Sequence, residues 1–194
     1  MMQFLTPKEL LAVLKVARAH SLRDWLTITI QFNHALRPSE VCAIKMDDIK
    51  KGSLTVQRMK GSKLTTQPLR SHRGQPLLDE VRGISEWCKV RPQDSGSALL
   101  CSAKGSAITA KHYNFLFKKY ARLAGLPESK THPHIVRHSA ATIMARQGID
   151  IGWIQTHLGH TSITSTAIYT HLNSEEVSAK AHEAFMDAFK DPSQ

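Results

Sequence analysis

Residues 54–69 read LTVQRMKGSKLTTQPL and carry the clearest β-signal in the chain. Apolar and polar residues alternate over 54–58, and alternation with period two is typical of a strand with one buried face. The glycine-containing segment 60–63 is typical of a turn, and 64–69 is extended again. This stretch therefore predicts a β-hairpin with a basic tip.

Helical patterns surround the hairpin on both sides. Thr6-Pro7-Lys8-Glu9 has the residue types of a capping box, and apolar residues at helical spacing follow it. Residues 22–32 contain strand-like residues, but apolar side chains on nearly every side favour a buried helix. Further helices are expected at about 38–45, 77–89, 109–124, 134–147, 150–157 and 174–189, and residues 98–100 form a short buried segment or a third strand. The predicted fold class is mostly α with a small antiparallel β-sheet (α+β).

The composition narrows the class of protein. With 194 residues, 41% hydrophobic and 22% charged, the chain suits one globular domain and not a disordered segment. Its apolar runs are too short to span a membrane, and no basic-then-apolar leader opens it, so we expect a cytoplasmic protein without a membrane partner. Lys and Arg number 26 against 16 Asp and Glu, a net charge of +10 that attracts polyanions such as nucleic acid.

Cys42, Cys88 and Cys101 have neither metal-site nor redox-motif spacing. All three lie among apolar neighbours. They are predicted to be buried, reduced thiols.

Six polar residues interrupt the apolar pattern: Arg37, Lys60, His134, Arg137, His160 and Tyr169. Each has an ordinary explanation when taken alone. Arg37 can pair with a nearby carboxylate, Lys60 can be a solvated charge, and Tyr169 can be a core anchor. Together they are the residue types needed to move a phosphodiester without a metal ion. Paired guanidiniums bind the charge of a phosphorane bidentately, a tyrosine can attack, and a lysine can protonate the leaving oxygen.

The same residues lie in stretches that resemble the tyrosine recombinases, also called phage integrases. The stretches are HALRPSEV (34–41), RMKG (58–61), HPHIVRHS (132–139) and IQTHLGH (154–160), followed nine residues later by Tyr169. Their order and intervals fit the family over essentially the whole chain. With residues 65–69, TTQPL, the chain resembles in particular the small fimbrial phase-variation recombinases.

The resemblance implies a tyrosine recombinase catalytic-domain fold and a role for each residue. It implies that Tyr169 is the nucleophile that forms a 3′-phosphotyrosine bond, Arg37 and Arg137 hold the non-bridging oxygens, His160 hydrogen-bonds the phosphate, Lys60 is the general acid, His134 is the general base, and Glu40 supports Arg37. It also implies that the reaction needs no metal, no ATP and no cofactor. The expected partners are duplex DNA with specific sites, a tetramer of this chain on DNA, and accessory DNA-bending proteins.

Three departures from the family pattern stand out. Ala35 replaces a frequent glycine, which we expect to matter little. The turn after Lys60 has a single glycine, so Lys63 is an alternative general acid. Only 36 residues precede Arg37, too few for the core-binding domain of larger members, so residues 1–194 are expected to be one catalytic domain without that N-terminal domain. Such a chain is either a naturally short member of the family or a fragment of a longer one.

The segment 174–189 has an apolar helical stripe, which suits docking either on a neighbouring subunit or on its own domain. Three other functions fit parts of the sequence. A metal hydrolase would use the pairs His134/His138 and His157/His160, although Arg137 would repel the cation. A non-catalytic DNA-binding module is expected to lack at least one of the six polar residues. A type IB topoisomerase would share the nucleophile and act as a monomer.

Overall fold

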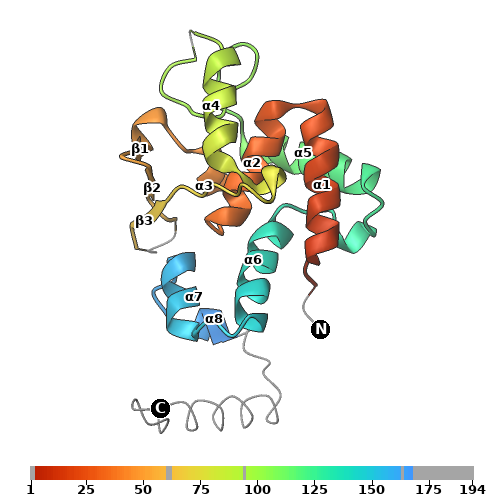
Figure 1. Cartoon of the computed structure of the whole chain (residues 1–194), viewed down its shortest axis with the longest axis vertical. Helices are drawn as coiled ribbons and strands as arrows, with labels where there is room; N and C mark the ends of the chain where they lie inside the picture. The colour runs from red at the N-terminus through yellow and green to blue at the C-terminus, as the bar shows by residue number, and fades with distance from the viewer. Residues whose placement is uncertain (1–2, 60–62, 94, 163, 168–194) are drawn as a thin grey trace, which may run out of the picture.

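The computed structural model describes residues 3–59, 63–93, 95–162 and 164–167, which form a mostly helical structure with one small sheet (Figure 1). The α-helices are α1 (Pro7–His20), α2 (Leu22–Asn33), α3 (Pro38–Cys42), α4 (Glu80–Val90), α5 (Ala110–Leu123), α6 (His134–Arg146), α7 (Ile151–Leu158) and α8 (Thr164–Ala167). The strands are β1 (Ile49–Lys50), β2 (Ser53–Val56) and β3 (Thr65–Pro68), and the 3₁₀ turns are η1 (Met46–Asp48), η2 (Pro76–Leu78) and η3 (Glu128–Lys130). The predicted α+β class is confirmed.

The sheet is antiparallel with strand order β1-β2-β3. Val56 pairs with Thr65 and Ser53 pairs with Pro68, so β2 and β3 are the two arms of the predicted hairpin. The third strand is β1 and not residues 98–100. Of that segment, only Ala98 forms an isolated bridge, to Lys45, so the prediction of a short buried segment is correct and that of a third strand is wrong.

Local capping signals set most helix boundaries. Thr6 caps α1 and forms the predicted capping box with Glu9. Two boundaries differ from the sequence prediction. The helix expected at 77–89 begins only at Glu80, because Asp79 caps it by accepting a hydrogen bond from the Arg82 N–H at 2.9 Å. The helix after Pro38 ends at Cys42, three residues earlier than expected.

The larger body of the molecule is built around the main hydrophobic core, which includes residues of α1, α2, α4 and α5. Helix α2 lies within it and contacts α1, α4, α5 and α6. Leu26, Ile28 and Ile30 are fully buried, so apolar residues on successive faces belong to a buried helix, as predicted, and not to a strand. Helix α4 comes close to α2 at Gly83, where a Cβ atom would lie 2.8 Å from the Trp25 ring. This packing explains why α4 has glycine at that position.

A smaller apolar cluster joins α6 and α7 to the end of α2. Small side chains on α6, including Ala140 and Ala141, pack with Ile154 and Leu158 of α7 and with Ala35. Figure 1 shows α6 running from the larger body towards α7 and α8, which lie below the sheet. This second cluster therefore brings the C-terminal end of α7 beneath the hairpin and beside the turn that follows α2.

The cysteine prediction is correct at two positions and wrong at one. Cys42 and Cys101 are buried, whereas Cys88 is exposed. Trp87 faces the core on α4, and the next residue is rotated by about 100° around a helix, so Cys88 points outward. Lys60, Tyr169 and the helix expected at 174–189 lie outside the described residues. Among the described helices, none is both long and apolar enough to cross a membrane.

Candidate active site

Arg37 and Glu40 lie at the start of α3 and bind each other. The Arg37 N–H donates to Glu40 Oε2 at 2.8 Å, and the guanidinium Nη1 donates to Oε1 at 2.7 Å. The ordinary expectation that Arg37 pairs with a carboxylate is thus correct. The Arg37 side chain nevertheless stays 23% exposed, while Glu40 is fully buried. Glu40 therefore holds the Arg37 guanidinium from the protein interior, and the other side of the guanidinium remains open to solvent.

The Glu40 carboxylate gathers groups from three parts of the chain. It accepts hydrogen bonds from Arg58 Nη1 at 3.1 Å and from the Met59 N–H at 3.1 Å, and Arg137 Nη1 lies 3.7 Å away. Burial alone would raise the pKa of Glu40, but the hydrogen bonds from Arg37 and Met59 and the charge of Arg58 outweigh it and lower the pKa. Glu40 is therefore ionised at neutral pH. It holds Arg37, as the resemblance implied, and also binds Arg58 and the backbone of Met59.

Arg137 extends from α6 towards α7. Its Nη1 donates to the Ala35 carbonyl at 2.5 Å, and its Nη2 donates to the Leu158 carbonyl at 3.0 Å. Ala35 adopts a left-handed backbone conformation with φ of 48°, where glycine is strained less. The conformation at this position accounts for the glycine that the family pattern often has there.

His160 directly follows the C-terminal cap of α7, Gly159. Its Nε2 accepts a hydrogen bond from Arg137 Nη2 at 2.9 Å, and its Nδ1 lies 2.9 Å from the Thr166 hydroxyl oxygen in α8. Gln155 donates to the His160 carbonyl at 3.2 Å. Burial and the charges of the nearby arginines lower the pKa of His160 to about 4, so the imidazole is neutral at neutral pH.

Arg58 has a larger part in the site than its sequence neighbours suggested. Its side chain is fully buried and donates to the carbonyls of His34 at 3.1 Å and His157 at 3.0 Å, and to the Thr65 hydroxyl at 2.8 Å. With its bond to Glu40, it joins the hairpin to α3 and to the C-terminal end of α7. The period-two pattern could have predicted that Arg58 points inward, because it occupies the next inward position after Leu54 and Val56, but it does not identify the partners of the side chain.

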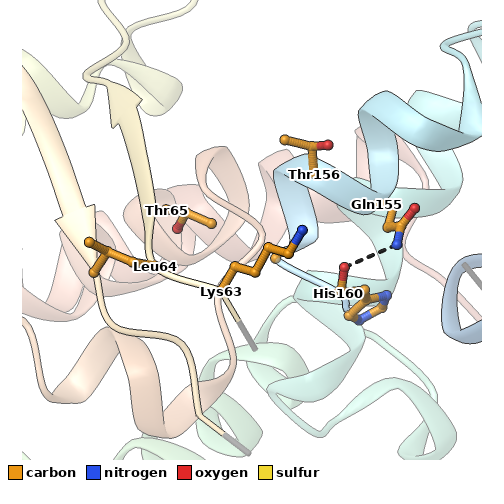
Figure 2. Close-up of a pocket in the computed structure, with 7 residues that line it drawn as sticks. Lys63, Leu64, Thr65, Gln155, Thr156 and His160 are labelled. Carbon is orange, nitrogen blue, oxygen red and sulfur yellow. Dashed lines mark hydrogen bonds between the residues drawn. The ribbon is translucent and has the colours of Figure 1, made fainter. Parts of the chain in front are cut away.

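A cavity of about 200 Å³ opens between the hairpin and α7 beside His160 (Figure 2). Its lining residues are Lys63, Leu64, Thr65, Gln155, Thr156, Gly159 and His160. Figure 2 shows the Lys63 side chain extending from the hairpin towards α7. Lys63, the alternative general acid, therefore lies on the same side of the structure as His160, whereas Lys60 is outside the described residues.

His134 is exposed at the first position of α6, one turn before Arg137. The part of the ring that is buried, together with the charges of His132, Arg137 and Arg37, lowers its pKa. Among the described residues, no group of three or more His, Cys, Asp or Glu side chains is placed to hold a metal ion. One member of the histidine pairs, His157, instead contacts the Asn33 carbonyl through Nε2 at 3.1 Å.

The chain belongs to the phage integrase family, which it matches over residues 3–176. It is 35% identical over 184 residues to tyrosine recombinase XerA of Pyrococcus furiosus, covering 93% of this chain and 61% of that relative. It is 32% identical over 177 residues to the type 1 fimbriae regulatory protein FimB of Escherichia coli K12, covering 88% of this chain and 84% of the relative. The predicted likeness to tyrosine recombinases, including the small fimbrial group, is confirmed.

The fold agrees with that assignment. The crystal structure of XerH recombinase bound to its difH substrate superposes with a TM-score of 0.76 and 25% identity, covering 93% of this chain and 54% of that one. The tyrosine recombinase catalytic-domain fold is therefore confirmed. The chain spans less than two thirds of the length of XerA and of the crystallised XerH.

Proposed function

We propose that this chain is a site-specific DNA recombinase that cleaves and rejoins duplex DNA through a 3′-phosphotyrosine bond. Family membership supports the class of reaction, and the names of XerA and XerH describe recombinases. FimB, of which the chain covers 84%, shows that a relative of similar length exists among the fimbrial regulators. Integration, excision and inversion all use this chemistry.

The observation that carries the proposal is the convergence of three guanidiniums, those of Arg37, Arg58 and Arg137, on the single carboxylate of Glu40. One buried negative charge holds three positive charges, so the site has an excess of positive charge. Arg37 is the partly exposed member of this group. Preorganised cationic donors of this kind stabilise the charge that develops on a phosphate during displacement.

The described tyrosines support Tyr169 as the nucleophile. The chain has three tyrosines, and two of them are buried in the core. Tyr113 donates to Gln31, and Tyr120 donates to Asp24 at 2.6 Å. Burial raises the pKa of both hydroxyls. Neither can reach a phosphodiester, which leaves Tyr169 as the candidate.

In the proposed step, Tyr169 Oη attacks the scissile phosphorus as His134 takes the phenolic proton. The bond from phosphorus to the 5′-oxygen breaks, and Lys60 or Lys63 gives that oxygen a proton. Arg37, Arg137 and the His160 imidazole hold the non-bridging oxygens. The phosphodiester energy stays in the tyrosyl bond, so the proposal requires no metal, ATP or cofactor.

We further propose that the chain acts in the cytoplasm as a tetramer on two DNA sites, with the segment 174–189 docking on a neighbouring subunit. Accessory DNA-bending proteins would set the geometry of the sites. The net charge of +10 supports a DNA partner, and the binding should weaken steeply as salt rises. XerH, which is similar to the present chain, was crystallised bound to its difH substrate, and this supports DNA as a partner of the present chain.

Covalent-adduct sequencing tests the proposal. The full chain and its Tyr169→Phe variant are incubated with genomic DNA of the source organism and denatured, and the DNA that stays attached to protein is sequenced. We expect adducts that depend on Tyr169 and cluster at paired, related sites. Adducts retained in Tyr169→Phe would refute the nucleophile, and adducts without sequence preference would favour a topoisomerase. Equal DNA binding by the two proteins is the control.

A further inference from the structure

The His160 imidazole has a hydrogen-bond partner on each ring nitrogen. Arg137 Nη2 lies 2.9 Å from Nε2, and Thr166 Oγ1 lies 2.9 Å from Nδ1. A guanidinium can only donate, so Nε2 must be the acceptor and carries no proton. The neutral ring then has its proton on Nδ1, which donates to the Thr166 hydroxyl. Two contacts thus fix the tautomer of this histidine in the structure.

That tautomer is wrong for the role His160 has in the proposed function. A histidine that hydrogen-bonds a phosphate oxygen needs an N–H directed at it, because phosphate oxygens accept. Nε2 is the ring atom on the Arg137 side, where the phosphate would bind, and it is unprotonated. Nδ1 bears the proton but faces Thr166. With this tautomer, His160 cannot give the phosphate this hydrogen bond without a change at the ring.

We propose that Thr166 is a positioning residue that sets the tautomer of His160, an inference that rests on the proposed function. In the DNA-free protein the Thr166 hydroxyl accepts from Nδ1–H. When a phosphate binds Arg137, the hydroxyl rotates and donates to Nδ1. The Nδ1 proton leaves to water and Nε2 takes one from water, so the ring stays neutral and Nε2–H donates to the phosphate. A hydroxyl can do this because it both donates and accepts.

The setting of Thr166 suits this role. Its side chain is fully buried, and a hydrogen bond in such a low-dielectric setting is stronger than one in water. It lies in α8, which contacts α7, the helix whose end carries His160. Tyr169 follows three residues later in the sequence. The same hydrogen bond therefore ties the histidine to the segment that leads to the proposed nucleophile.

The first test reads the tautomer directly by ¹⁵N NMR of the imidazole in the full chain at neutral pH. In the DNA-free protein, we expect Nδ1 protonated and Nε2 unprotonated. For the DNA-bound state, the Tyr169→Phe variant is placed on a duplex carrying a site recovered by adduct sequencing, and the protonated nitrogen should be Nε2. A protonated Nε2 in the free protein, or an Nδ1 that keeps its proton on DNA, would overturn the proposal. The DNA-free measurement stands even if no site is recovered, so it separates this inference from the proposed function.

The second test uses two variants that separate the hydroxyl of Thr166 from its methyl group. Thr166→Val keeps the shape and removes the hydroxyl, whereas Thr166→Ser keeps the hydroxyl and removes the methyl group. In the DNA complex, Thr166→Val has no hydroxyl to donate to Nδ1 and hold the Nε2–H tautomer. Single-turnover cleavage from the preformed complex should therefore slow by about 3- to 10-fold, the worth of one hydrogen bond, with DNA affinity unchanged. Thr166→Ser should retain most of the parent rate. Equal losses in both variants would assign Thr166 to packing alone and overturn the proposal.

A double-mutant cycle completes the test. If Thr166 acts through the imidazole, Thr166→Val should have no further effect on the cleavage rate in a His160→Ala background. Additive losses would show that the hydroxyl acts elsewhere and would overturn the proposal. If Thr166→Val does not fold, the tautomer measurement and the serine variant still decide.

Discussion

The Glu40 carboxylate accepts a hydrogen bond from the Arg58 guanidinium, with Oε2 and Nη1 3.1 Å apart and neither side chain exposed to solvent. The same carboxylate binds the N–H of Met59 and the guanidinium of Arg37. Helix α3 and the hairpin segment just beyond β2, joined through residues 18 apart in the sequence, are thus held together by one buried charge. The hairpin therefore helps to position the residues of the candidate active site.

Removing this buried charge should destabilise the protein strongly. Glu40→Ala should lower the free energy of unfolding by about 3–5 kcal/mol, because it leaves buried guanidiniums without a counter-charge. Urea unfolding measures the change. Glu128→Ala is the matched control, since Glu128 pairs with Arg122 and Lys118 on the surface and should matter little. Similar losses in both variants would show that burial of the Glu40 cluster contributes nothing special.

Gly159 should tolerate a side chain less well than a glycine with the same backbone conformation. Gly159 and Gly125 have φ of +70° and +78°, so alanine costs about 1–2 kcal/mol of backbone strain at either position. At Gly159 a Cβ would also lie 2.8 Å from Arg58 Cγ, whereas at Gly125 it meets open space. Gly159→Ala should therefore lose about 1–3 kcal/mol more than Gly125→Ala in urea unfolding. Equal losses would mean that Arg58 moves aside freely.

Changing the leaving atom of the DNA substrate decides whether Lys60 or Lys63 is the general acid. Without the acid, cleavage of an ordinary duplex should slow by about a hundredfold or more. A duplex with sulfur in place of the bridging 5′-oxygen needs no proton on the leaving group, so the rate of the true acid's alanine variant should recover. We expect recovery in Lys60→Ala and little loss in Lys63→Ala. Recovery in Lys63→Ala alone would move the assignment to the lysine beside His160 in Figure 2.

The fall of the cleavage rate at acidic pH should report the protonation of His134. A general base works only when neutral, and burial with the charges of His132 and Arg137 lowers the pKa of His134 from its usual 6.5. The rate should therefore fall on acidification with a midpoint below 6.5, because the ring stays neutral to lower pH. Single-turnover rates across pH on a recovered site measure this midpoint. His134→Gln should remove this fall and slow the plateau by about a hundredfold. An unchanged fall in that variant would exclude His134 as the base.

Local patterns explain which fold predictions succeeded. The hairpin, the buried helix α2 and the start of α1 depend on alternation, periodicity and caps within a few neighbouring residues, so the sequence contains them. The start of α4 at Glu80 is set by the local Asp79 cap, a signal that the sequence prediction did not use. The exposure of Cys88 depends on which face of α4 packs on the core, and no local pattern specifies that face. The roles expected for Lys60 and Tyr169 remain predictions.

The sequence by itself determined the fold class, the family and the set of residue types that can act on a phosphodiester. Only the tertiary structure decided that Arg58 is a buried link between the hairpin and α7, that Ala35 takes a left-handed conformation, and that Thr166 faces His160. The physical reason is distance along the chain. Arg58 and His157 are 99 residues apart, and contacts of that kind arise from packing between helices and the sheet, not from any neighbouring residue.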